Sequence, residues 1–449
     1  MINGGIEVRR IGSVMICFAL ISVVTFCPLQ AASAADDEVY TLQRSIEESF
    51  ANNLELKAQK ERITQSLFVK KQAKAEFFPK LGTSYGYTKL SETPSFRSEL
   101  TPGQRFAVGT EDNYQWRGTV SQPVFTGFAL VSSFELAKLG IDESKTSYEM
   151  ERLDLALRVK EAYFGILEAE KAVQVAEQEV DALASHAKEA RSFYDVGLIP
   201  VNDVLETEVQ LSNARYNLVR ARNGLRLARS AFNVTLSRAI NAPVRVEDVL
   251  TYEPFAGSFE EEVQTAMENR PETKLIEIAI DQAEQQKRLA RSDMFPDVYL
   301  NYDYIKEGDS ADVSGSPFHD ANRWEATASL TWTFWEWGKT HYAVQEKESL
   351  LAELARSREA LEDSIRLEVK EAVLALQEAE ENIPTTSKAI EQATENMRVS
   401  RERYKARVNT STEVLDAQTL LTQARNNYYR ALYDHHLAKA RLERAVGTY

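Results

Sequence analysis

Residue types that usually carry out catalysis or hold a metal are sparse in this sequence of 449 residues. Its five histidines include the neighbours His435 and His436, whose side chains would point about 100° apart on a helix. Such a pair makes poor joint metal ligands, and His435 continues an apolar heptad seam, as a core residue would. There is no glycine-rich phosphate loop and no His-Glu-x-x-His motif. The sequence therefore predicts no enzyme, no cofactor and no metal site.

Several carboxylates stand beside two turns that separate predicted long helices. Residues 410–413 (Thr-Ser-Thr-Glu) match a capping box, in which Glu413 reaches back to the start of its helix. Asp203 would lie in a first helical turn, where a negative charge complements the helix dipole. Gly197 is expected to end its helix in a left-handed conformation. These structural roles can coexist with a functional role for the same carboxylates.

The first 34 residues are typical of a secretory signal peptide. Two arginines precede an apolar run at residues 11–26, and Ala-Ser-Ala at 32–34 offers small residues for cleavage. Cys27 could alternatively be a lipidation site, but bulky Phe26 before it argues against that. Cleavage after Ala34 would also remove Cys17, so the exported chain would have no disulfide and no cysteine ligand.

The charge and apolar content restrict the partners of the exported chain. The formal net charge of −15 argues against nucleic acid, whose phosphates require a basic surface. After the signal segment, no stretch approaches 18 consecutive apolar residues, so no membrane-spanning helix is predicted. The exported protein would be either a periplasmic protein or one inserted through β-strands.

The sequence is an internal duplication. Phe-Phe-Pro at 77–79 recurs as Met-Phe-Pro at 294–296, an offset of 217, and Val-Lys-Glu-Ala at 159–162 recurs at 369–372, an offset of 210. Seven of twelve positions from 159 are identical to those from 369. We predict a first repeat at 35–237, a linker at 238–257 that contains prolines and a glycine, and a second repeat at 258–449.

Each repeat is predicted to contain the same elements. A helix, at 41–76 or 259–293, comes first, and two alternating strands and two long antiparallel helices follow. Apolar residues in the long helices are spaced four and three apart from Leu155 to Tyr194, and the pattern recurs 210 residues later. This 3.5-residue period is typical of coiled coils, and a helix of about 65 residues would be about 100 Å long. The fold class is therefore mainly α.

The strands alternate in the way expected of an outer-membrane barrel. In the segments around 114–121, 298–304 and 324–334, aromatic and aliphatic residues alternate with polar ones. All five tryptophans lie in or beside the second and fourth strands, and they would form two interfacial girdles: Trp116, Trp324, Trp332, Trp335 and Trp337. An ordinary periplasmic sheet remains the alternative, although it does not explain the positions of the tryptophans.

Four strands cannot close a barrel, because single-chain barrels begin at eight and no edge can stay open in lipid. Two copies would supply eight strands and three copies would supply twelve. An eight-stranded barrel is filled by its own side chains, so three copies suit a conduit better. The loops at about 91–112 and 306–322 would then face outside the cell.

Taken together, these features resemble the TolC-like outer-membrane efflux proteins over essentially the whole mature chain. The resemblance rests on the segments that enter the strands (77–81 and 294–298), those that leave them (122–125 and 334–339), the repeated Val-Lys-Glu-Ala helices, and the turns at 194–205 and 404–415. It implies a homotrimer with a twelve-stranded barrel in the outer membrane of a Gram-negative bacterium and a twelve-helix tube in the periplasm. It also implies a passive exit duct for efflux or type I secretion, whose partners are an inner-membrane pump and a periplasmic adaptor (membrane fusion protein).

The same resemblance implies roles for residues at the hairpin tips. Asp203, Tyr404, Glu413 and Asp416 match positions that hold the periplasmic end shut. Arg407, which replaces the usual tip glycine, would belong to the same gate and supply its cation. The neighbouring tip residues would dock the adaptor: Gly197, Leu198, Val408 and Asn409. Repeated around a three-fold axis, the carboxylates would form rings that favour cations. The alternative functions are a structural coiled-coil spacer or an adaptor, although an adaptor would not duplicate the strands and hairpins.

Overall fold

The structure is a computed structural model, and the segment predicted as the signal peptide, with Cys17 and Cys27, lies outside the residues that it describes. The predicted boundaries of the signal peptide, the two repeats and the linker remain predictions. The described residues are 39–97, 99, 103–252 and 254–449.

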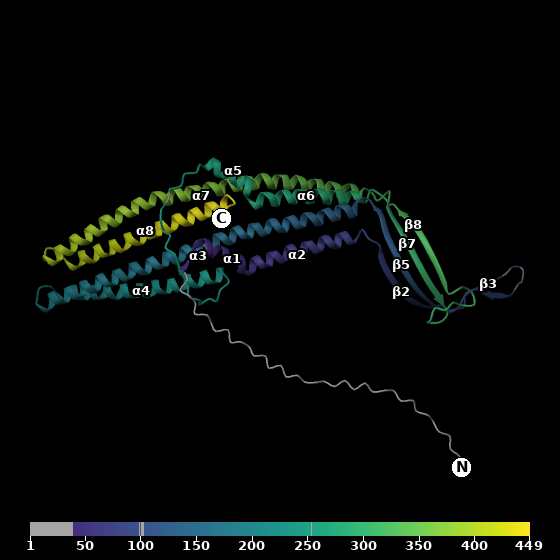
Figure 1. The fold of residues 1–449 in the computed structure, drawn as a ribbon, viewed down its shortest axis with the longest axis horizontal. Helices are drawn as coiled ribbons and strands as arrows, with labels where there is room; N and C mark the ends of the chain where they lie inside the picture. Colours follow the sequence, from purple (N-terminus) through teal and green to yellow (C-terminus); the bar gives the residue numbers. More distant parts are fainter. Residues whose placement is uncertain (1–38, 98, 100–102, 253) are drawn as a thin grey trace, which may run out of the picture. The chain divides into compact units, whose positions relative to one another are not determined.

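Two long helical hairpins dominate the described residues (Figure 1). Helices α3 and α7 each contain 67 residues, about 100 Å at 1.5 Å per residue, and α4 and α8 each contain 35. The heptad pattern accounts for the packing of the helices within each hairpin, because its apolar residues are buried. In the first hairpin these include Leu155, Val159 and Ile166. Their counterparts in the second hairpin, Ile365, Val369 and Leu376, are buried in the same way. The bounds are α3 (Ala129–Asp195), α4 (Val201–Thr235), α7 (Lys339–Lys405) and α8 (Ser411–Ala445).

The single helices predicted at 41–76 and 259–293 are wrong, because each segment forms two helices. Asn53 interrupts the first: its backbone leaves the helical region at ψ 130°, and its side chain accepts hydrogen bonds from the backbone of Glu55 and Leu56. Pro271 interrupts the second, since proline forces the preceding residue out of the helical conformation. The four helices are α1 (Leu42–Asn52), α2 (Leu54–Ala75), α5 (Phe259–Asn269) and α6 (Pro271–Ser292).

The residue at each interruption donates a hydrogen bond to the carboxyl-terminal end of a long hairpin. The Asn53 amide donates to the carbonyl of Thr235, the last residue of α4, at 3.4 Å. The Arg270 guanidinium donates to the carbonyl of Ala445, the last residue of α8, at 3.3 Å. The two repeats thus use the same contact, one with a neutral donor and one with a charged donor.

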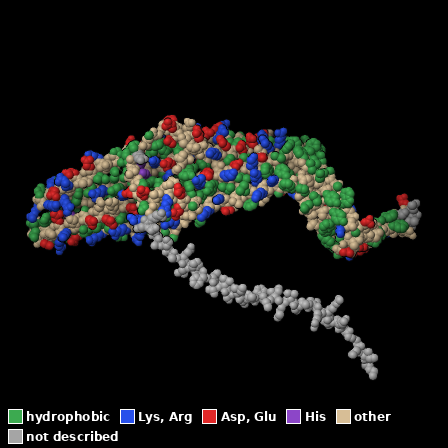
Figure 2. All heavy atoms as spheres, in the orientation of Figure 1, with side chains coloured by type: hydrophobic (Ala, Val, Ile, Leu, Met, Phe, Trp, Pro, Cys, Tyr) green, Lys and Arg blue, Asp and Glu red, His purple; other side chains and the backbone are tan. Residues whose placement is uncertain are grey.

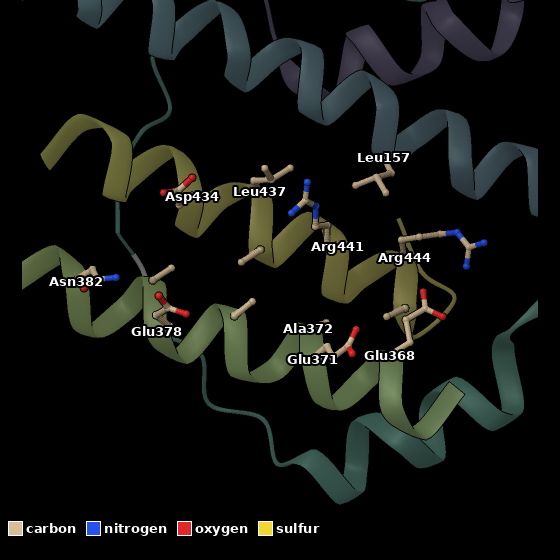
Figure 3. Close-up of a pocket in the computed structure, with 14 residues that line it drawn as sticks. Leu157, Glu368, Glu371, Ala372, Glu378, Asn382, Asp434, Leu437, Arg441 and Arg444 are labelled. Atoms are coloured by element: carbon tan, nitrogen blue, oxygen red, sulfur yellow. The ribbon is translucent and has the colours of Figure 1, made fainter. Parts of the chain in front are cut away.

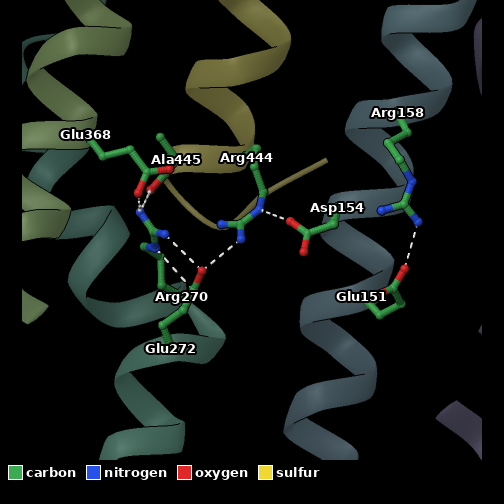
Figure 4. A network of polar contacts seen from close by, with 8 residues as sticks. All are labelled: Glu151, Asp154, Arg158, Arg270, Glu272, Glu368, Arg444 and Ala445. Atoms are coloured by element: carbon green, nitrogen blue, oxygen red, sulfur yellow. Dashed lines mark hydrogen bonds and ion pairs between the residues drawn. The ribbon is translucent and has the colours of Figure 1, made fainter.

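Arg270 also begins a buried ionic network that joins four helices (Figure 4). Its side chain is only 5% exposed and pairs with Glu272 at 2.9 Å and Glu368 at 2.6 Å. Arg444 links Glu272, at 2.8 Å, to Asp154 of α3, at 2.5 Å. Burial alone would raise the pKa of Glu272, but hydrogen bonds from Arg270 and Arg444 outweigh it and lower the pKa to about 2.

A four-stranded antiparallel sheet adjoins the helices, with strand order β2-β5-β7-β8. Its register agrees with the predicted alternation: Val120 lies opposite both Leu81 and Tyr302 on one face. On the other face Thr119 donates to Asp303 at 2.5 Å. The strands are β2 (Lys80–Lys89), β5 (Asp112–Thr126), β7 (Asp297–Gly308) and β8 (Asn322–Thr331).

The ends of the sheet differ from the prediction at two places. The fourth strand ends at Thr331 rather than near residue 334, because its partner Asp297 is the first residue of β7 and offers nothing further to pair with. The predicted loop at 91–112 contains a small hairpin of its own, β3 (Ser95–Arg97) with β4 (Arg105–Ala107). Elsewhere, β1 (Val39–Tyr40) pairs in parallel with β6 (Arg245–Val246).

Helices and strands are arranged in the same order, and both arrays have open edges. Helices α2, α3, α6 and α7 pack in that sequence, as do β2, β5, β7 and β8, while α4, α3, α8 and α7 are successive neighbours toward the turns (Figure 1). Among the described residues, no strand pairs with the outer edges of β2 and β8. Hydrophobic side chains gather where the strands meet the helices, whereas acidic and basic ones alternate along the helices (Figure 2). None of the described helices contains an apolar stretch of the length needed to span a bilayer.

Candidate functional site

The turns that end the two hairpins have the same backbone geometry. Gly197 has φ 72°, and its N–H donates to the carbonyl of Tyr194. Arg407 has φ 61°, and its N–H donates to the carbonyl of Tyr404, 210 positions from the first pair. This left-handed position suits glycine, as predicted for Gly197, but it strains an arginine. The Arg407 guanidinium lies 5.5 Å from the centre of the Phe193 ring, so it reaches from the second tip to the first.

The backbone strain at Arg407 can be separated from its side-chain contact. We expect Arg407→Gly to be more stable than Arg407→Ala by about 1 kcal/mol, because both variants lose the cation–π contact and only glycine relieves the left-handed backbone. Chemical unfolding of the two purified variants, followed by circular dichroism, measures this difference. Equal stability of the two variants would contradict the prediction.

The structure places the other four predicted gate residues near the tips as well, but in different environments. Tyr404 is buried, Asp203 is half-buried in the first turn of α4, and Glu413 and Asp416 are exposed in the first turns of α8. Burial raises the pKa of Tyr404, and the nearby Asp203 carboxylate acts in the same direction. Among the docking residues, Leu198 and Val408 are 42% and 68% exposed, and Gly197 is also exposed.

The predicted capping box is only half formed. Thr410 accepts a hydrogen bond from the backbone of Glu413, at 3.4 Å, as a cap should. The reciprocal contact is made by Asn409 instead, because its side chain accepts from the backbone N–H of Thr410 at 3.1 Å. Asn409 thus acts as a local turn residue, and the Glu413 side chain is left available to other groups.

A buried polar cluster that the sequence analysis did not identify joins the two hairpins just inside the tips. His186 of α3 is 3% exposed, and its Nε2 lies 2.9 Å from the hydroxyl of Ser411 in α8. Ser411 also lies 3.0 Å from the hydroxyl of Thr207 in α4. The Tyr404 ring packs edge-on against His186, with ring centres 4.8 Å apart. Burial lowers the pKa of His186 to about 4, and the nearby Arg401 acts in the same direction, so the imidazole is neutral at pH 7.

The five tryptophans predicted as girdles lie at the two ends of the sheet. Trp116 is half-buried in β5, and Trp324, near the start of β8, stacks on Tyr302 and is 65% exposed. Trp332, Trp335 and Trp337 follow β8 instead of lying in it, and they are 54%, 66% and 85% exposed. Eight residues of extended chain, from Trp324 to Trp332, cover about 26 Å.

A cavity of about 540 Å³ lies among α3, α7 and α8, away from the tips (Figure 3). Alanines such as Ala372 and Ala438 line the cavity, and the charged side chains around it include Glu368 and Arg444, which already belong to the buried ionic network. Its lining residue nearest to the tip along α7, Asn382, is 22 residues from Tyr404, about 33 Å along a helix. None of the residues predicted to be functional lines the cavity. A metal site would require at least three His, Cys, Asp or Glu side chains close together, and the described part of the chain contains no such group.

Comparison with known proteins agrees with this architecture. The family model described as outer membrane efflux protein matches residues 45–238 and again residues 263–448. The outer membrane protein TolC of Vibrio cholerae is 22% identical over 394 residues, covering 84% of this chain and 83% of TolC. The alkaline protease secretion protein AprF of Pseudomonas aeruginosa is 23% identical over 390 residues, covering 84% and 78%.

The fold also matches that of solved channels. A crystal structure of CusC, described as forming a transmembrane channel, has a TM-score of 0.78 and 15% identity, covering 91% of this chain and 92% of CusC. TolC is named as an outer membrane protein and AprF as a secretion protein, the CusC structure is described by channel formation, and the family model by efflux. Because the family model covers most of both halves, this chain belongs to the outer membrane efflux protein family.

Proposed function

We propose that three copies of this chain form a passive exit duct, with a twelve-stranded barrel in the outer membrane of a Gram-negative bacterium and a twelve-helix tube in the periplasm. One observation supports this proposal above all. The strands β2, β5, β7 and β8 and the helices α2, α3, α6 and α7 are neighbours in the same order, and both arrays are open at their outer edges. A copy beside each edge would pair β8 with β2 and α7 with α2 by one rotation. Three copies leave room for a passage, whereas two would give a filled eight-stranded barrel.

The arrangement of the tryptophans supports insertion of the sheet into a membrane. Strands tilted by about 40° would reduce the 26 Å between Trp324 and Trp332 to a height of about 20 Å, close to the apolar band of about 25 Å in such barrels. Exposed indoles at both ends of the strands are suited to the two lipid–water interfaces. The hairpin of β3 and β4 would then lie outside the cell.

The tips would supply the periplasmic gate and the docking surface. Exposed Glu413 and Asp416, repeated three times around an axis, would form acidic rings at the closed end, and Arg407 would supply the cations between them. Exposed Leu198 and Val408 offer apolar contacts to a periplasmic adaptor that connects the duct to an inner-membrane pump. The substrate class, whether small molecules, metal ions or proteins, is left open.

Electron microscopy of the mature protein, extracted from outer membranes in detergent, tests the assembly. We expect a three-fold tube about 100 Å long below a short barrel, set by the length of α3 and α7. A monomeric, water-soluble rod would overturn the proposal and favour a structural coiled-coil spacer or an adaptor. In cells without redundant channels, deletion of the gene should sensitise them to amphiphilic toxins or stop the export of a substrate.

The proposed gate leads to a prediction about leakage through the closed duct. We expect the double variant Asp203→Ala, Glu413→Ala to raise single-channel conductance in planar bilayers, because we propose that both carboxylates help to hold the periplasmic end shut. Glu391→Ala, in an exposed ion pair with Lys388 further from the tip, is the control. Conductance equal to that of the control would remove both carboxylates from the gate.

A further inference from the structure

A chain of hydrogen bonds crosses from the first hairpin to the second just inside the tips, and the hydrogens available fix its direction. The Thr207 hydroxyl donates to the backbone carbonyl of Asp203 at 2.8 Å, which uses its only hydrogen. The Ser411 hydroxyl, 3.0 Å away, must therefore donate to Thr207. No hydrogen of Ser411 is left for the imidazole, so the 2.9 Å contact between them is a bond donated by Nε2–H of His186. The neutral imidazole thus carries its proton on Nε2.

The other ring nitrogen, Nδ1 of His186, is buried and makes no hydrogen bond to any described residue. An unpaired acceptor costs a moderate amount while the ring is neutral. A further proton can bind only at Nδ1, because Nε2 already carries one, and it would create a buried, charged N–H without an acceptor. Water would supply that acceptor, so protonation favours any movement of the surrounding helices that hydrates the ring.

The charged groups around the imidazole also oppose a second positive charge. Arg401 of α7 is held beside the ring, because its guanidinium donates to the hydroxyl of Ser185, the neighbour of His186 in α3, at 3.0 Å. Its charge acts against protonation of the ring. Helix α8 faces the ring with the neutral hydroxyl of Ser411. The other titratable groups near the cluster come from the three remaining helices: Glu189 of α3, Asp203 of α4 and Tyr404 of α7. Among the described residues, no carboxylate is bonded to Nδ1, so no anion is in place to pair with an imidazolium.

Both hairpins enclose the imidazole, so hydrating it separates them. His186 and Thr207 belong to the first hairpin and are 3% and 0% exposed. Tyr404 and Ser411 belong to the second hairpin and are 3% and 1% exposed. The Tyr404 ring packs edge-on against the imidazole, and Ser411 lies against its Nε2. Water reaches the ring from this side only when the second hairpin moves away from the first.

We infer that His186 is a proton sensor: in acid it releases the second hairpin from the first, and the proposed duct opens at its periplasmic end. This inference rests on the proposed function and adds a regulation to the proposed gate. The pKa of an exposed imidazole is about 6.5, and that of the buried His186 is about 4, so the separated tips bind more protons between these values. From pH 7.5 to pH 5.5, the ratio of separated to closed tips should therefore rise about tenfold in each copy. Exposed carboxylates stay ionised at pH 5.5, since their usual pKa is about 4.

Spin labels measure the release directly, whether or not the chain forms a channel. Thr412 of α8 donates to Glu206 of α4 at 3.1 Å across the two hairpins, and both residues are exposed. Labels on Glu206→Cys and Thr412→Cys in the exported protein should therefore show strong dipolar broadening at pH 7.5, and part of it should be lost at pH 5.5. Adding His186→Gln should preserve the broadening at both pH values, because the glutamine amide can donate to Ser411 but takes up no proton. Adding His341→Gln, at an exposed histidine, should leave the loss unchanged.

The same comparison in planar bilayers tests the opening. The open-to-closed ratio of wild-type channels should rise about tenfold or more from pH 7.5 to pH 5.5, and His186→Gln should show no such gain. In the wild type alone, the gain should begin near pH 6.5, where an exposed imidazole titrates. A gain that begins only below pH 5, where carboxylates titrate, would overturn the sensor without reference to any variant.

The two measurements separate the sensor from the duct. If channels form but the broadening falls equally in the wild type and His186→Gln, or does not fall in the wild type, the sensor is wrong while the duct stands. If no channel forms at any pH, the proposed function is wrong, and the spin labels alone decide whether His186 releases the tips.

Discussion

Replacing Arg270 by alanine should lower the free energy of unfolding by about 3–5 kcal/mol, the range expected when one partner of a buried ion pair is removed. The variant leaves Glu272 with one arginine instead of two, and it leaves Glu368 and the carbonyl of Ala445 without this donor. The last turn of α8 would also lose its hydrogen bond from the break between α5 and α6. Urea unfolding of the purified protein, followed by circular dichroism, measures the change.

The control for this prediction lies beside the network in Figure 4. Arg158 also pairs with a glutamate, Glu151, at 2.7 Å, but its side chain is 42% exposed. Arg158→Ala should therefore cost less than about 1 kcal/mol. Arg270→Asn, which introduces the residue found at the equivalent position 53, should recover part of the loss because it can still donate to Ala445. Similar losses for the Arg270 and Arg158 variants would contradict a special role for the buried network.

Acid should loosen the contact between the hairpins through His186. Its pKa is about 4 in the folded chain and about 6.5 in the unfolded chain, so the unfolded state binds more protons between these values. The stability that the neutral imidazole contributes is therefore complete above pH 6.5 and is lost as the pH falls toward 4. The full loss is about 3 kcal/mol, because one pKa unit corresponds to about 1.4 kcal/mol. Ser411, Tyr404 and Arg401 lie near the imidazole, and Thr207 is linked to it through Ser411.

The measurement compares unfolding free energies at pH 7 and pH 4.5 for the wild type and His186→Gln. The wild type should lose about 2–3 kcal/mol more than the variant over this interval, since the other titrating groups contribute equally to both. His341→Gln, at an exposed histidine near the start of α7, should behave like the wild type. Parallel losses in the wild type and His186→Gln would show that this histidine does not titrate differently on folding.

Much of the fold could be predicted from the sequence because its periodicities extend over many residues. The seam from Leu155 to Tyr194 specifies a long helix whatever its surroundings, and the alternation around Trp324 specifies a strand. The helix break at Asn53 was not predicted, since its partner, the carbonyl of Thr235, lies 182 positions away in the sequence. The end of the fourth strand depends equally on a distant residue, Asp297, which begins the partner strand.

The candidate site was predicted less completely than the fold. The resemblance to TolC-like proteins predicted a functional role for the carboxylates of the tips. In the structure, however, the side chains that connect the two hairpins near the tips are His186, Thr207 and Ser411. Thr207 occupies a core position of the heptad pattern, and a polar residue at such a position was the available signal. His186 gave no such signal, because its burial comes from the packing of the second hairpin, which lies more than 200 residues further along the chain.

Helices α3 and α7 have equal lengths, and so do α4 and α8. This equality constrains how the protein can evolve or be redesigned. One residue inserted in α3 alone would advance the first tip by about 1.5 Å and rotate it by about 100°, so that it would no longer be level with the tip of α7 and α8. Insertions should be tolerated only as whole heptads, about 10.5 Å each, added to all four arms together. The seven-residue difference between the repeats falls between the start of β2 and the start of β5, where no long helix runs. The lengths of the four hairpin helices should therefore change only together, while the loops that connect the strands can change in length independently.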